Sequence, residues 1–85
     1  MKAGFKNPRM RILSGDRTVE GYISGSGTCS ITNSKNETTD ISFPGEVNEV
    51  ELRVGDIVQW EADTDLSFYE VCYPAYADGR FLNLD

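Results

Sequence analysis

Carboxylates are the side chains best placed to do chemistry in this chain, because histidine is absent from its 85 residues. That absence removes the commonest general base and the commonest metal ligand together. A pair of glutamates could still work as acid and base, as in glycoside cleavage. The candidates for that role are Glu20 and Glu70, each inside a strand-like run. A serine triad needs a histidine to activate the hydroxyl group, so it is excluded for Ser14, Ser24 and Ser30.

The two cysteines and one acidic loop give weaker signals. Cys29 and Cys72 each lie within an apolar alternation and neither belongs to a CxxC pair, so we expect buried, reduced thiols. Glu61, Asp63 and Asp65 could offer oxygens to Ca²⁺, but their run lacks the glycine and the distal glutamate of an EF-hand loop. We therefore interpret this run as a solvated connector and predict neither a metal ion nor a cofactor.

Short extended segments, separated by turns, must position these groups. Apolar alternation predicts strands over residues 11–13, 18–24, 28–32, 41–43, 50–54, 57–60 and 66–73. Residues 33–40 are polar and predict an exposed hairpin tip, and the Gly55-Asp56 pair predicts a tight turn that joins two strands as a hairpin. Helical periodicity is missing from the chain, which indicates an all-β fold, a small antiparallel barrel or sandwich with little or no helix.

The length and net charge of the chain limit the number of domains and the classes of partner it could bind. One domain over residues 1–85 is expected, with an irregular arm over 1–10 and a tail over 74–85. The net charge of −6 and the pI near 4.5 argue against nucleic-acid and anionic-membrane partners, since binding phosphates needs clustered lysine and arginine. No apolar run approaches the roughly 20 residues of a membrane span, and no secretory signal is recognisable. We expect a soluble cytoplasmic protein.

Three segments, taken in order, resemble the cupin family of small antiparallel β-barrels or jelly rolls. Residues 22–27, YISGSG, resemble the Y-(hydrophobic)-x-G-x-G strand and turn at the end of the family's first motif. Residues 51–58, ELRVGDIV, resemble the L-x-x-G-D-(hydrophobic)-V that opens its second motif, and residues 71–81 resemble the tail of many small bacterial cupins. The resemblance covers residues 18–82 and implies a cupin-like barrel over most of the chain.

The metal ligands of that family are missing here. Counted from Gly55, the histidine of the second motif falls on Leu66. Counted back from Gly25, the metal-binding glutamate of the first motif falls on Thr18. The two histidines of the first motif would fall among residues 11–14, where none occurs. The resemblance therefore implies a scaffold without metal, and the metal-dependent oxygenase, oxalate-degrading and isomerase activities of cupins do not carry over.

The resemblance also implies an interior site for a small molecule. Side chains alternate along a strand, so the positions of Thr18 and Leu66, which face inward in the family, imply that every second residue after each also faces inward. Trp60 lies beside a position where cupins often point a bulky residue into the cavity. Aromatic walls with few polar groups suit a small ligand. The predicted ligand-binding residues are Arg11, Glu20, Tyr22, Trp60, Phe68 and Glu70.

Two interpretations of this interior stay open. In one, the pocket is real, and Arg11 or a ligand satisfies Glu20 and Glu70, because a buried unpaired carboxylate costs several kcal/mol. In the other, the aromatic rings simply fill the core. A register slip of one residue would turn both glutamates to water.

We predict a metal-free cupin-like protein that binds a small molecule rather than catalysing a reaction. Cupins commonly dimerise through edge strands, so the resemblance also implies a homodimer. Two alternatives belong to other classes. One is a small acidic interaction module or inhibitor, of the kind that phages and mobile elements encode, acting on a basic protein partner. The other is a metal-independent enzyme that uses Glu20 and Glu70.

Overall fold

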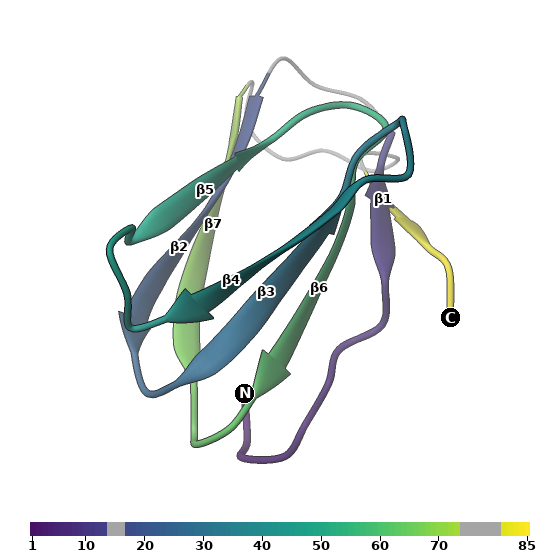
Figure 1. Cartoon of the computed structure of the whole chain (residues 1–85). Helices are drawn as coiled ribbons and strands as arrows, with labels where there is room; N and C mark the ends of the chain where they lie inside the picture. Colours follow the sequence, from purple (N-terminus) through teal and green to yellow (C-terminus); the bar gives the residue numbers. More distant parts are fainter. Residues whose placement is uncertain (14–16, 74–80) are drawn as a thin grey trace.

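The computed structural model describes residues 1–13, 17–73 and 81–85, which form two antiparallel sheets packed face to face (Figure 1). The larger sheet has the strand order β4-β3-β6-β1-β8 and the smaller sheet the order β5-β2-β7. The strands are β1 Met10–Ile12, β2 Arg17–Ser24, β3 Gly27–Thr32, β4 Thr38–Phe43, β5 Glu49–Leu52, β6 Ile57–Ala62, β7 Ser67–Tyr73 and β8 Phe81–Asn83. The described residues include no helix, so none that could cross a bilayer. The predicted all-β class is confirmed.

The strands pair in a nested order. β1 pairs with β8, β2 with β7 and β3 with β6, all antiparallel. Further ladders join β1 to β6, β2 to β5 and β3 to β4. Among consecutive strands, β3 and β4 alone stay in one sheet, and every other connection carries the chain to the opposite sheet. Each strand can therefore turn its apolar side chains toward the same interior.

The predicted hairpin at Gly55-Asp56 is wrong, although the tight turn is present. Gly55 has a φ of 96°, and the Asp56 carboxylate accepts a 2.8 Å hydrogen bond from the Arg53 amide. The strands on either side do not pair with each other, because β5 pairs with β2 and β6 pairs with β3 and β1. β5 and β6 both carry apolar residues that face the interior. Because the turn carries the chain from one sheet to the other, the apolar residues of both strands are buried between the sheets.

The polar tip between β3 and β4 is an exposed hairpin, as the sequence predicts. The Asn33 side-chain oxygen accepts hydrogen bonds from the amides of Lys35 and Glu37, at 2.9 and 3.0 Å. Asn36 has a φ of 62°, a conformation that asparagine tolerates better than most residues. β4 begins at Thr38, so the strand is longer than predicted.

The N-terminal arm lies along β6 beyond the end of β1. The Gly4 amide donates to the Ala62 carbonyl, the Ala62 amide donates to the Phe5 carbonyl, and the Asn7 amide donates to the Trp60 carbonyl. These hydrogen bonds hold the arm against the sheet. Of the predicted C-terminal tail, β8 joins the larger sheet beside β1, and residues 74–80 lie outside the described part of the chain.

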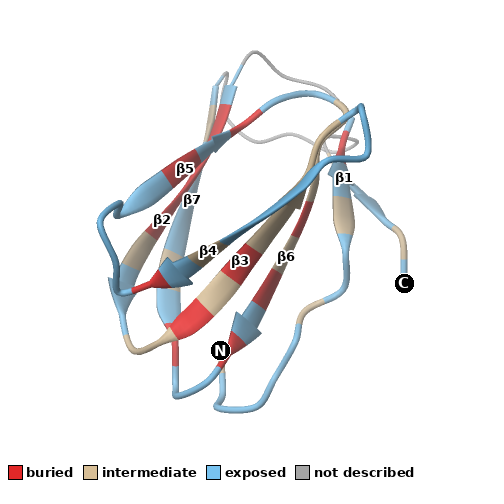
Figure 2. Ribbon diagram, in the orientation of Figure 1, coloured by how far each residue is buried: buried red, intermediate tan, exposed pale blue. Residues whose placement is uncertain are grey.

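The core lies between the central strands of the two sheets. Figure 2 shows buried segments on β2, β3, β5 and β6. The buried hydrophobic residues of the cluster are Ile12, Cys29, Phe43, Val50, Leu52, Val58, Trp60, Ala62 and Leu66. Both cysteines are reduced, with Cys29 buried and Cys72 half-buried. The smaller sheet thus covers one face of the larger sheet, and its inner side chains meet the aromatic residues of β4 and β6.

Candidate functional site

Glu20 and Glu70 lie directly opposite each other on neighbouring strands. The β2–β7 ladder pairs Glu20 with Glu70 and Tyr22 with Phe68. Directly opposed residues share a face of the sheet. Glu20 is only 2% exposed, whereas Glu70, on the edge strand, is exposed. The pair therefore consists of the buried carboxyl group of Glu20 and the solvent-exposed carboxyl group of Glu70.

Trp60 provides the hydrogen bond that Glu20 needs in the interior. Its indole Nε1–H donates to Glu20 Oε1 at 3.1 Å, and Trp60 itself is 0% exposed. A buried carboxyl group and a buried indole N–H would each be costly without a partner. One bond across the two sheets, from β6 to β2, satisfies both groups.

The environment keeps Glu20 protonated at neutral pH. The pKa of Glu20 is raised to about 8, first by burial and then by the nearby charge of Glu70. The hydrogen bond from Trp60 favours the ionised form and lowers the pKa, while a hydrogen bond to Glu70 favours the protonated form. Because burial and the like charge prevail, Glu20 at pH 7 is a neutral acid with a hydroxyl group to donate.

Four aromatic rings pack beside this pair. Tyr22 stacks on Phe43 with ring centroids 5.6 Å apart, Phe43 on Trp60 at 5.3 Å, and Trp60 on Phe68 at 4.4 Å. Trp60 is fully buried, and Tyr22 and Phe68 are half-buried. Trp60 therefore fills the core, while Tyr22 and Phe68 keep part of their surface at its margin.

The structure brings together five of the six predicted site residues, and Arg11 stands apart. Its neighbour Ile12 is 2% exposed and points into the core, so the alternation along β1 turns Arg11 outward, where it is exposed. Trp60, and not Arg11, is the partner of Glu20. The sequence located the glutamates on the correct face but not the group that satisfies them.

Two further residues belong to this environment. Phe43 joins the aromatic stack from β4. This contact could not be predicted, because the short segment before Pro44 does not show which strand Phe43 will face. Cys72 lies two positions from Glu70 on the same face of β7, with its Sγ 3.8 Å from Glu70 Oε1. The alternation along β7 places this thiol on the inner face.

Metal ligation finds no support in this arrangement. Within the described part of the chain, no three side chains among cysteine, aspartate and glutamate gather closely enough to hold a metal ion. Leu66 is 1% exposed and packs in the core.

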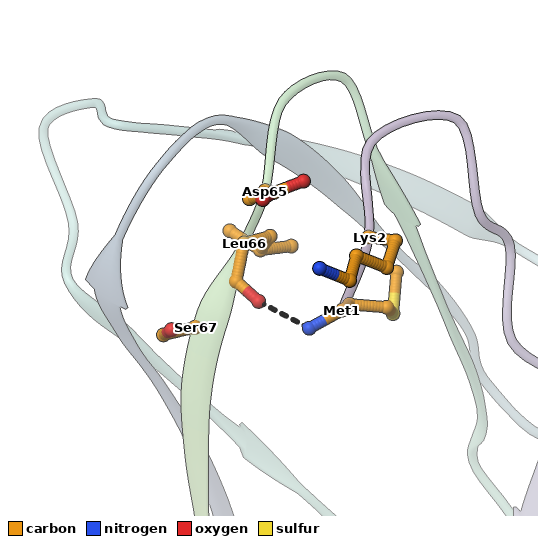
Figure 3. A pocket seen from close by; sticks show the side chains of 5 residues that line it. All are labelled: Met1, Lys2, Asp65, Leu66 and Ser67. Atoms are coloured by element: carbon orange, nitrogen blue, oxygen red, sulfur yellow. Dashed lines mark hydrogen bonds between the residues drawn. The ribbon is translucent and has the colours of Figure 1, made fainter.

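A separate cavity of about 290 Å³ lies where the N-terminus meets the turn between β6 and β7 (Figure 3). Met1, Lys2, Asp65, Leu66 and Ser67 line it. The Met1 ammonium donates a 2.7 Å hydrogen bond to the Leu66 carbonyl, and the Ala3 amide donates to the Asp65 carboxylate at 2.9 Å. These bonds fasten the arm to the turn, and the cavity does not include the predicted site residues.

Comparison with known proteins adds no assignment: no family model matches the chain, and no curated protein matches its sequence.

Proposed function

We propose that this protein is a small binding module of cupin-like architecture that holds a small organic molecule at the Glu20–Glu70 pair. The observation that carries the proposal is Glu20 itself, a carboxyl group 2% exposed whose pKa is raised to about 8. A strongly shifted pKa with a specific charge partner is more common at functional sites than elsewhere. Small domains such as this chain of 85 residues have modest stability. Burying an acid in such a domain costs folding free energy that an apolar side chain of similar size would not cost.

The pair offers complementary chemistry to a ligand. Protonated Glu20 can donate a hydrogen bond, and the exposed Glu70 carboxylate can accept one. The half-buried Tyr22 and Phe68 add aromatic surface at the margin of the same face. A donor, an acceptor and an apolar contact together suit a small polar organic molecule. Such a molecule would approach from the Glu70 side, since Glu20 is sealed.

The cupin-like architecture has its own support. A jelly roll folded from one long hairpin pairs its first strand with its last and continues inward from there. The pairs β1–β8, β2–β7 and β3–β6 follow that order. The fourth nested pair would be β4–β5, but β4 instead pairs with β3 and β5 with β2. The proposed relation to cupins thus rests on three nested pairs and the sequence resemblance.

A ligand screen with matched variants tests the function. A panel of uncharged and zwitterionic metabolites would be screened by thermal shift against the native protein, Glu70→Gln and Glu46→Gln. Glu46 is an exposed glutamate on the connection between β4 and β5, so its variant controls for the loss of one surface charge. We expect a compound that stabilises the native protein and Glu46→Gln, and a loss of that stabilisation in Glu70→Gln.

Two results would contradict the proposal. A panel in which no compound stabilises the native protein would remove the small-molecule function. A compound that stabilises Glu70→Gln as strongly as the native protein would show that binding occurs elsewhere on the molecule.

A further inference from the structure

The edge strand β7 closes the interior over Glu20. In the described part of the chain β7 pairs on one side only, with β2. Its inner face contributes Phe68, which stacks on Trp60 at 4.4 Å, and Glu70, which lies opposite Glu20. If β7 moved away from β2, Glu20 would meet water and the Trp60 ring would lose one of its two stacking partners.

The β2–β7 ladder is irregular beside Phe68. The register runs evenly from the Arg17–Tyr73 pair to the Tyr22–Phe68 pair and then shifts before Ser24 pairs with Ser67. An edge strand with a shifted register at one end has fewer regular ladder bonds there, and local opening of proteins begins in such places. β7 is thus suited to separate from the sheet while β2 keeps its ladder with β5.

The repulsion between the two carboxyl groups depends on whether Glu20 keeps its proton. If Glu20 releases its proton to solvent, two negative charges oppose each other across neighbouring strands, and like charges in directly opposed positions destabilise a sheet. One of these charges would also be buried without a cation, which is expensive. Separation of β7 would relieve both costs, because it hydrates Glu20 and increases the distance between the carboxylates.

Among the residues that the structure describes, the other groups around Glu20 do not supply a compensating charge. β7 contributes Glu70 with Cys72 beside it, and β3 contributes Cys29, whose thiol has a pKa raised to about 12 by burial and by the charges of Glu20 and Asp40. β5 contributes Val50 opposite Glu20, and β6 contributes Trp60. Arg17 on β2 pairs with Glu51 and lies over the Tyr73 ring. None of the ion pairs among the described residues includes Glu20 or Glu70.

We propose that β7 is a gate held closed by the proton that Glu20 shares with Glu70, and that loss of this proton opens the gate and admits water to Glu20. Opening itself is a property of the unliganded protein. The consequence for binding rests on the function proposed above, because a molecule that accepts a hydrogen bond from protonated Glu20 loses that donor when the gate opens.

The fluorescence of Trp60 tests the gate directly, because Trp60 is the sole tryptophan of the sequence. Emission spectra would be recorded from pH 5 to pH 9.5 for the native protein, Glu20→Gln, Glu70→Gln and the control Glu46→Gln. We expect the native protein and the control to shift to longer wavelength with a midpoint near pH 8, which is the pKa of Glu20. Glu20→Gln has no proton to lose and is expected to show no shift.

Glu70→Gln gives a second, independent result. The charge of Glu70 raises the pKa of Glu20, so its removal is expected to move the midpoint to lower pH. Should Glu20→Gln fail to fold, this displacement still decides the role of the pair. Hydrogen exchange at pH 9 is expected to show lost protection in β7 and retained protection in β3 and β6.

The outcomes separate the gate from the binding function. An unchanged transition in Glu20→Gln, no transition in the native protein, or loss of protection in all strands together would overturn the gate. A metabolite that binds at Glu70 without any fluorescence transition would overturn the gate and leave the binding function standing. A transition near pH 8 without any stabilising metabolite would support the gate as a property of the fold and count against the binding function.

Discussion

At the scale of single residues, Glu20 sets how the stability of the protein depends on pH. Its pKa is about 8 in the folded state, above the ordinary value of 4.5. Below pH 4.5 both folded and unfolded states hold the proton, so the full stability is present. Between pH 4.5 and 8 the unfolded state releases the proton while the folded state retains it, and stability falls by about 1.4 kcal/mol per pH unit. Above pH 8 the loss is complete.

The variant Glu20→Gln is therefore expected to stabilise the protein at neutral pH. Glutamine cannot ionise, and its amide can still accept the Trp60 N–H bond and donate to Glu70. Urea unfolding should give a gain of about 3.5 kcal/mol at pH 7, which follows from the 1.4 kcal/mol per pH unit over the interval from the ordinary pKa of 4.5. At pH 4 the gain should vanish. A variant that is less stable than the native protein at both pH values would contradict the shifted pKa.

At the scale of elements, the turn between β2 and β3 fixes how the two sheets meet. Gly25 has a φ of 92°, and a Cβ atom at this position would collide with the Asp65 backbone carbonyl. Ser26 continues the contact, since its amide donates to the Thr64 hydroxyl at 2.9 Å and its carbonyl accepts from the Asp63 amide at 3.0 Å. The β2–β3 turn and the β6–β7 turn thus hold each other at the end of the molecule where β7 begins.

The comparison of Gly25→Ala with Gly4→Ala tests this contact. Gly4 also has a positive φ, 79°, but no atom lies within 4 Å of the position that its Cβ would take. Both variants carry backbone strain of about 1 kcal/mol. Gly25→Ala adds a backbone collision and should lose at least about 2 kcal/mol more of unfolding free energy. Equal losses in the two variants, measured by urea unfolding, would show that the two turns are not tightly packed.

The elements themselves were largely predictable, and their pairing was not. Alternation located seven of the strands, and the strand pattern correctly turned Glu20 and Glu70 to one face. The sequence around Gly55 showed a tight turn but could not show that it joins two sheets, because the choice of partner depends on strands far away in the chain. Arg11 was a candidate because it is a cation near an expected pocket, and only the register of β1 shows that it faces outward.

At the scale of the whole molecule, two sheets with a tryptophan between them explain how a buried acid is accommodated. The smaller sheet supplies Glu20 and Glu70, and the larger sheet supplies Trp60, whose N–H bonds Glu20 across the interior. Sequence reasoning left open whether the aromatic residues fill a core or surround a pocket. The answer differs by residue: Trp60 is sealed in the core, while Tyr22 and Phe68 lie at its margin beside the exposed Glu70. Only the packing of both sheets together could separate these roles.

The protonation of Glu20 underlies both the binding site and the gate, and a carboxyl titration measures it. The chemical shift of the Glu20 side-chain carboxyl carbon would be followed by NMR from pH 3 to pH 9.5 in the native protein, with Glu46 as an exposed reference in the same spectra. We predict that Glu20 titrates near pH 8. Titration of Glu20 near its ordinary value of 4.5 would rule out both proposals, because Glu20 would then be ionised at neutral pH and could neither donate to a ligand nor hold β7 closed.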